Sequence, residues 1–136
     1  MTDFKTLKLT RKPNQFLMAP MEMCGAATPH ADCPEFPIPA SELVEKLHES
    51  VTAEDRVTVK SRDPERGTAR YVQRSKLFRF PDIIDIQVID LGENKSAFAA
   101  YSRAVYGYRD FGVNRNRISR WVGKLIRATG GTFEQD

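Results

Sequence analysis

The chain has 136 residues, of which 40% are hydrophobic and 29% are charged. This length and composition are typical of one globular domain with a modest core, and they exclude a disordered tail and a disulfide-dense miniprotein. The 21 Lys and Arg residues exceed the 18 Asp and Glu residues by three, which is too small an excess to identify a nucleic-acid binder. No run of eighteen apolar residues occurs, and Met1–Thr10 is charged, so we expect no transmembrane helix, no signal peptide and a cytoplasmic, bacterial-type protein.

Residues 1–39 are expected to form an extended, proline-rich arm that packs on the rest of the domain. Apolar residues such as Phe16, Met18 and Phe36 give this arm anchors that a free linker would not need. Six prolines exclude a long helix or a central strand in it: Pro13, Pro20, Pro29, Pro34, Pro37 and Pro39.

Cys24 and Cys33 are too far apart in the chain for a CxxC redox or zinc element. The neighbouring His30 and Asp32 have no second cluster of ligands. We therefore predict two free thiols in a loop, no metal site and no cofactor, with a disulfide as the alternative in an oxidising compartment.

After the arm, periodicity predicts two helices and four strands. Leu43, Leu47 and Val51 recur at helical spacing and predict a helix over residues 40–52. An apolar stripe predicts a last helix over residues 113–128, which Gly130 and Gly131 end. Alternating β-branched and aromatic residues predict strands between them, with hairpin turns at 63–67 and 92–95 and a tight corner at 80–82; the strands are 56–60, 69–75, 83–90 and 97–106.

Consecutive hairpins make the predicted sheet antiparallel, and the flanking helices indicate an α+β fold. We expect a sheet of four or more strands, covered on one face by both helices, in a helix-grip-like two-layer sandwich. The domain would span residues 40–130, and residues 131–136 would form a flexible tail.

The positive charge is concentrated near the C-terminus. Residues 1–39 and 40–112 are each neutral, whereas residues 113–136 hold five cations and two acids. Arg115 and Arg117 lie in the first helical turn, where the helix dipole disfavours a cation by roughly 0.3 to 1 kcal/mol. Arg120, Lys124 and Arg127 of the same helix could also lie on a solvated face near acidic lipid headgroups. An external phosphate or carboxylate could compensate Arg115 and Arg117. So could an internal carboxylate, the candidates being Asp82, Asp85, Asp90 and Asp110.

The turn before the last helix combines packing residues with polar side chains. Asp110 or Asn114 can cap the helix, and the aromatic residues of the turn, Tyr106, Tyr108 and Phe111, are expected to pack. The polar side chains are dense enough to line a pocket if the sheet and the helix diverge; they are Ser102, Arg103, Asp110, Asn114 and Arg117.

Three stretches resemble motifs of the domain-of-unknown-function 1499 family. The stretch SRAVYGYRDFGVNRNRISRW, residues 102–121, resembles the family's signature, in which a strand runs into Gly-Tyr-x-Asp and then a helix. Arg74–Asp82 is similar to its Arg-Ser motif, and Pro13–Phe16 is similar to its proline-asparagine element. The motif positions that match are Arg74, Ser75, Phe80, Asp82, Ser102, Arg103, Gly107, Tyr108, Asp110, Gly112, Asn114 and Arg117.

The resemblance implies no activity and no catalytic residue, because the family has no assigned activity. Many of its members carry an N-terminal membrane anchor or export signal. Since this sequence starts with neither, the resemblance gives little support to a location in the cell envelope.

We therefore expect a non-catalytic binding module for a small anionic or amphipathic ligand, or for an acidic segment of a partner. The alternative is a structural or protein-interaction domain near a membrane surface. His48 and the cysteines have no evident triad partner, and a neutral sheet lacks the cations of a nucleic-acid groove, so a hydrolase-type enzyme and a nucleic-acid binder fit less well. The candidate ligand-binding residues are Arg103, Asp110, Asn114, Arg115, Arg117, Ser102, Tyr108 and Arg74.

Overall fold

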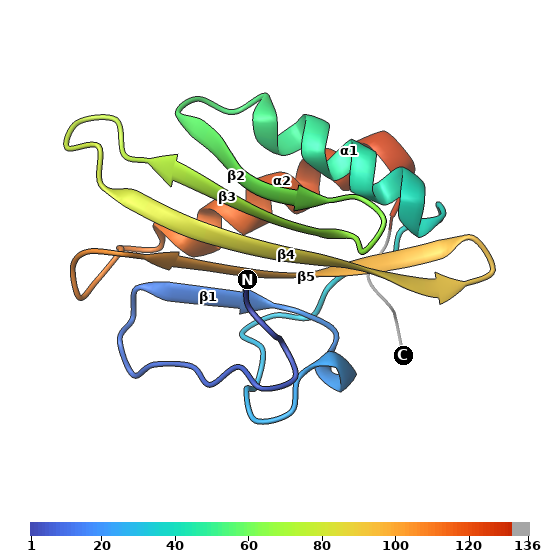
Figure 1. Ribbon diagram of the computed structural model, residues 1–136, viewed down its shortest axis with the longest axis horizontal. Helices are drawn as coiled ribbons and strands as arrows, with labels where there is room; N and C mark the ends of the chain where they lie inside the picture. The colour runs from blue at the N-terminus through green and yellow to red at the C-terminus, as the bar shows by residue number, and fades with distance from the viewer. Residues whose placement is uncertain (132–136) are drawn as a thin grey trace.

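The computed structural model describes residues 1–131, which form one antiparallel sheet and two long helices (Figure 1). The strand order is β1-β5-β4-β3-β2. The α+β class and the antiparallel sheet with two helices are therefore confirmed, with five strands. Apart from Gly131, the expected C-terminal tail lies outside the described residues. The elements are β1 (Gln15–Met18), η1 (Met21–Met23), α1 (Ala40–Thr52), β2 (Val57–Asp63), β3 (Thr68–Arg74), β4 (Pro81–Gly92), β5 (Lys95–Ala104) and α2 (Val113–Thr129).

Both helices form where the apolar periodicity predicts them. α1 has the predicted bounds and buries Leu43, Leu47 and Val51 on one face, because residues four apart lie on the same side of a helix. α2 ends one residue later than predicted, before Gly130, whose φ of 76° is a left-handed conformation that glycine adopts without strain.

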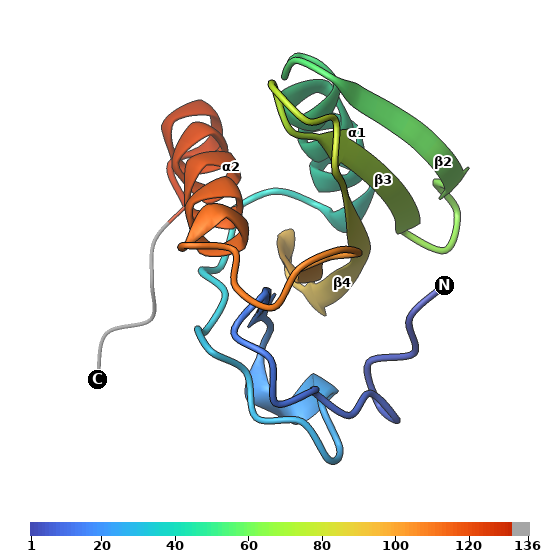
Figure 2. The same ribbon diagram turned by 90° about the vertical axis from the view of Figure 1, so that its left-hand side faces the viewer.

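Both helices cover the same face of the sheet, and the N-terminal segment covers part of the other face (Figure 2). Side chains alternate between the two faces along each strand. The helix-covered face forms the main core, built around Trp121, Tyr71, Phe98, Ile84 and Phe36. The second face carries a smaller apolar cluster of Phe4, Leu17, Ala19, Ala99 and Tyr101.

Two details of the sheet differ from the prediction. β1 forms an extra strand, which pairs with β5 at one edge, where the flanking prolines interrupt no ladder. The corner predicted at residues 80–82 is wrong, because Pro81 pairs with Arg74 and begins β4. A proline is tolerated there because the first residue of a strand can lack the N–H that a ladder needs. The connection between β3 and β4 is therefore the loop 75–80.

Candidate functional site

A buried polar network holds Arg117, the fifth residue of α2. Its Nε donates to Gln73 Oε1 at 2.6 Å, and its Nη2 donates to Asp82 Oδ2 at 2.8 Å. Its Nη1 donates to Ser102 Oγ at 3.0 Å and to Asn114 Oδ1 at 2.7 Å. A guanidinium has five N–H groups, so four of the five are satisfied within the chain.

Asp110 connects this network to the start of α2. Its carboxylate accepts hydrogen bonds from the backbone N–H of Gly112 at 2.9 Å and of Asn114 at 3.2 Å. It also accepts one from Asn114 Nδ2 at 2.7 Å. Asp110 lies two residues before the N-cap Gly112, satisfies free N–H groups at the start of α2 and places a negative charge where the dipole favours one. Burial raises the pKa of Asp82 above its usual range, although Arg117 acts against this shift.

Arg103 lies on the opposite face of the sheet from Arg117. Because successive strand residues alternate, Ser102 faces α2, whereas Arg103 Nη1 donates to Asp85 Oδ2 at 3.0 Å on the other face. Arg70 Nε donates to Asp85 Oδ1 at 2.6 Å, and Thr2 also donates to this carboxylate. Burial alone would raise the pKa of Asp85, but these hydrogen bonds outweigh it and lower the pKa to about 2.

The structure thus brings together four of the eight candidate residues, namely Ser102, Asp110, Asn114 and Arg117. The other four lie apart from this network. Arg115 is exposed, with its guanidinium 5.4 Å from the ring centre of Phe16. Tyr108 is exposed beside Arg109, and Arg74 Nη1 donates to the carbonyl oxygen of Arg79 at 2.9 Å.

Hydrophobic side chains are exposed on two loops at the same end of the sheet. The loops follow β3 and β5, and the pairing of Arg74 with Pro81 and of Asp82 with Ala104 places their ends side by side. Both loops face the viewer in Figure 2, the first in yellow-green and the second in orange. The exposed hydrophobic residues are Leu77, Phe78, Phe80, Val105, Tyr106, Tyr108, Phe111 and Val113. We call residues 74–80 and 105–115 the loop end.

Three of these aromatic rings form a continuous strip. Phe78 stacks on Phe80 with 5.5 Å between ring centres, and Phe80 lies 6.1 Å from Tyr106. All three side chains are nevertheless more than half exposed, at 67%, 52% and 62%. Tyr106, Tyr108 and Phe111 are expected to pack, but only Tyr106 packs against another ring, and all three are exposed, because β5 ends at Ala104 and the chain leaves the sheet before reaching them.

Phe111 combines exposure with backbone strain. Its side chain is 90% exposed and its φ is 52°, a left-handed conformation in which a bulky residue is rare. Neither feature stabilises the fold. Strain of this kind is typical of functional loops.

The loop end is also strongly basic. It contains five cations and one acid, an excess of four charges against three for the whole chain. The acid is Asp110, which already accepts a backbone N–H at the start of α2. The cations are Arg74, Lys76, Arg79, Arg109 and Arg115, all exposed. Segment totals along the sequence do not show this excess, because the acids that balance these cations within residues 40–112 lie outside the two loops, although Asp55 and Asp82 are at the same end of the sheet.

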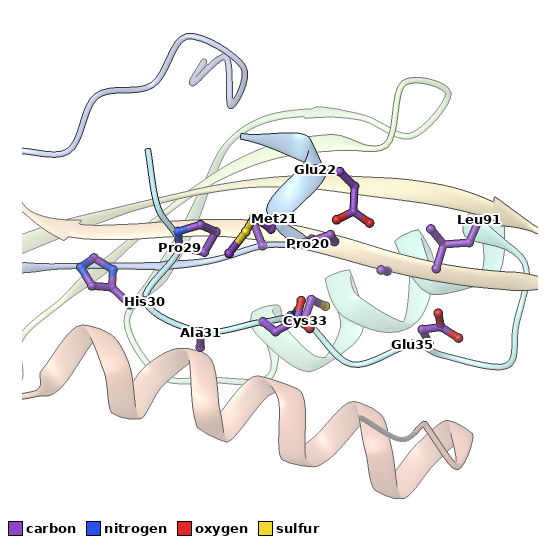
Figure 3. A pocket seen from close by; sticks show the side chains of 12 residues that line it. Pro20, Met21, Glu22, Pro29, His30, Ala31, Cys33, Glu35 and Leu91 are labelled. Carbon is purple, nitrogen blue, oxygen red and sulfur yellow. Dashed lines mark hydrogen bonds between the residues drawn. The ribbon is translucent and has the colours of Figure 1, made fainter. Parts of the chain in front are cut away.

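A cavity of about 330 Å³ lies elsewhere, between the N-terminal segment and the sheet (Figure 3). The histidine and the cysteine that line it both form hydrogen bonds within the fold. His30 Nδ1 accepts the backbone N–H of Leu17 at 2.9 Å. Burial raises the pKa of Cys33 to about 12, so its sulfur stays a neutral thiol near neutral pH. Both cysteines are free thiols. Glu22 and Glu35 lie at the end of the cavity opposite His30.

Within residues 1–131, no three His, Cys, Asp or Glu side chains are grouped so that they could hold a metal ion. Over the same part of the chain, no helix has the length and apolarity needed to cross a membrane.

Comparison with known protein families gives a match over most of the chain. The family model described as "Protein of unknown function (DUF1499)" matches residues 7–125. No curated protein matches the chain.

Proposed function

The chain belongs to the DUF1499 family of proteins of unknown function, and from its surface we propose that it is a non-catalytic binding module whose loop end binds a partner that is both apolar and anionic. The observation that carries this proposal is the exposed strip of Phe78, Phe80 and Tyr106. Burying such a strip against a partner is favourable by roughly 25 cal/mol per Å² of apolar surface removed from water.

Because the loop end is positively charged, we expect its partner to be anionic. Its five exposed cations lie in the same two segments of the chain as the aromatic strip, and its one acid accepts hydrogen bonds from backbone N–H groups. Guanidinium groups form strong hydrogen bonds with phosphate and carboxylate. Exposed apolar and basic groups in one patch are typical of an interaction surface.

The network around Arg117 supports this placement of the binding surface. A ligand anion at Arg117 would have to displace Asp82 or the side chains of Gln73, Ser102 and Asn114, all of which are buried or nearly so. Displacement would leave buried polar groups unpaired, at a cost of about 1 to 3 kcal/mol each. Within residues 1–131 no cation of the loop end pairs with a carboxylate, and the Arg74 side chain donates only to the carbonyl oxygen of the exposed Arg79.

Titration of the full chain with octyl phosphate, followed by backbone amide chemical shifts, tests this proposal. An amphipathic anion should shift the amides of residues 74–80 and 105–115. Phe78→Ser and Arg79→Gln should each weaken this binding. Leu91→Ser and Arg66→Gln, which remove an exposed hydrophobic residue and an exposed cation at the opposite end of the sheet, should not. Shifts that map instead to the cavity of Figure 3 would overturn the proposal.

A further inference from the structure

On the basis of this proposed function, we infer that the loop end docks on the surface of an anionic lipid bilayer. In this arrangement Phe78, Phe80 and Phe111 lie at the level of the lipid headgroups. The surrounding Lys and Arg side chains face the lipid phosphates. The rest of the domain stands away from the membrane.

The shape of the loop end suits a bilayer. The two loops that carry its hydrophobic residues lie at the same end of the sheet (Figure 1). All residues of 74–80 are exposed. Exposed loops of this kind can enter a soft interface without a complementary surface, whereas a folded protein partner would have to supply matching pockets.

The aromatic and basic residues of the loop end are of the types that bind a membrane interface. Tyr rings accumulate where hydrocarbon meets water, and Phe side chains on membrane-binding surfaces are buried at the boundary between headgroups and acyl chains. Lys76 and Arg79 flank Phe78 in the sequence, and Arg109 lies between Tyr108 and Phe111. Each ring therefore has a cation within a few residues of it. Clusters of cations close to an anionic leaflet contribute about 1 kcal/mol per Lys or Arg.

The strained conformation of Phe111 supports the same conclusion. A ring that is 90% exposed on a left-handed residue gains nothing from the fold. The Phe111 ring is removed from water only when the loop end contacts another surface, which in this proposal is the membrane interface.

The single tryptophan of the chain provides a spectroscopic test. Trp121 is fully buried in the main core, so its fluorescence in the unmodified chain should be insensitive to vesicles. In the Phe111→Trp variant, vesicles of phosphatidylcholine with 30% phosphatidylglycerol should shift the emission to shorter wavelength, and brominated lipids should quench it. The unmodified chain is the matched control. An unchanged Phe111→Trp spectrum would overturn the inference.

Vesicle flotation with charge variants tests the role of the cations. Lys76→Gln with Arg79→Gln should lower the partition coefficient by about 25-fold, which is about fivefold for each charge. Arg66→Gln with Lys95→Gln removes two exposed cations at the opposite end of the sheet and should change it less than twofold. Binding should fall steeply as salt rises. Equal losses in both double variants, or equal binding to neutral vesicles, would contradict the inference.

The octyl phosphate titration separates the two proposals. If octyl phosphate binds at the loop end and vesicles do not, the membrane inference fails and the binding surface stands. An acidic amphipathic peptide that binds the loop end when vesicles do not would assign the surface to a protein partner and would also overturn the inference. If neither octyl phosphate nor vesicles bind, both proposals fail.

Discussion

Arg117 and Asp82 form an ion pair of 2.8 Å beneath α2, with side-chain exposures of 6% and 13%. The pair supplies the negative charge that the sequence led us to expect, since Arg117 is the fifth residue of α2, near the end at which the helix dipole disfavours a cation. The compensating charge comes from the second residue of β4, across the core from the helix. This arginine therefore joins α2 to the sheet.

We expect Arg117→Ala to lower the free energy of unfolding by about 3 kcal/mol, because it leaves Asp82 buried without its partner. Chemical denaturation measures this change. Arg115→Ala, in the same turn but exposed, should change the stability by less than about 0.5 kcal/mol. Similar losses in the two variants would contradict an internal role specific to Arg117.

Acid should destabilise the fold through two carboxylates whose pKa values are lowered to about 2, Asp85 and Glu54. Burial opposes both shifts, and hydrogen bonds from Arg70 to Asp85 and from Arg120 to Glu54 outweigh it. Because the folded state binds fewer protons than the unfolded state, this stabilisation is present above about pH 4.5 and is lost as the pH falls through about 2.

Asp85→Asn should therefore lower the stability at pH 7 by about 2 kcal/mol and make its dependence on pH flatter between about pH 4 and 2. Denaturation curves across this range measure both effects. Asp90→Asn changes an exposed carboxylate of the same strand, which accepts only the backbone N–H of Gly92 in the described chain, and serves as the control. An unchanged slope in Asp85→Asn would show that this carboxylate is not coupled to folding.

Phe111→Gly should raise the free energy of unfolding by up to about 1 kcal/mol, because glycine adopts a φ of 52° without strain. Tyr108→Gly, at an exposed position of the same loop without a positive φ, should lower it. Thermal and chemical denaturation measure the two changes. A loss of stability in Phe111→Gly would mean that the ring contributes to the fold, which would remove one argument for its role at the surface.

The two thiols should react at different rates with a disulfide reagent. Cys33 is buried, its pKa is raised to about 12, and its sulfur contacts backbone groups of Pro34 and Phe98. Cys24 is half-buried. We expect one thiol per chain to react under native conditions and two in denaturant, with Cys24→Ser abolishing the native reaction. Rapid native labelling of Cys24→Ser would show that the segment around Cys33 opens readily.

Local patterns predicted much of the fold. The bounds of α1 were predicted from its apolar spacing, and four strands were predicted near their observed positions. β1 was missed because its four residues lie between prolines, and only its pairing with β5 defines it. The helix-grip-like comparison and the division of the chain at residue 39 stay predictions.

The candidate site was predicted less completely. Ser102, Asn114 and Arg117 were expected together, and they form one network, since a strand end and the following helical turn are close in sequence. Arg103 was grouped with them, although alternation along the strand sends it to the other face. Leu77 and Phe78 were not singled out as surface residues, because hydrophobic residues in a short loop have no period that distinguishes exposure from burial.

By itself the sequence determined the period of both helices and of four strands, and therefore most of the secondary structure and the fold class, since these depend on interactions between near neighbours in the chain. Its segment totals placed the excess charge in the last helix. Only the tertiary structure decided where the free charges are, because it pairs Arg117 with Asp82 and brings Arg120 and Lys124 to Glu54. It also gathers five cations and an exposed aromatic strip at one end, which no count along the chain can show, since electrostatic and hydrophobic interactions depend on distance in space.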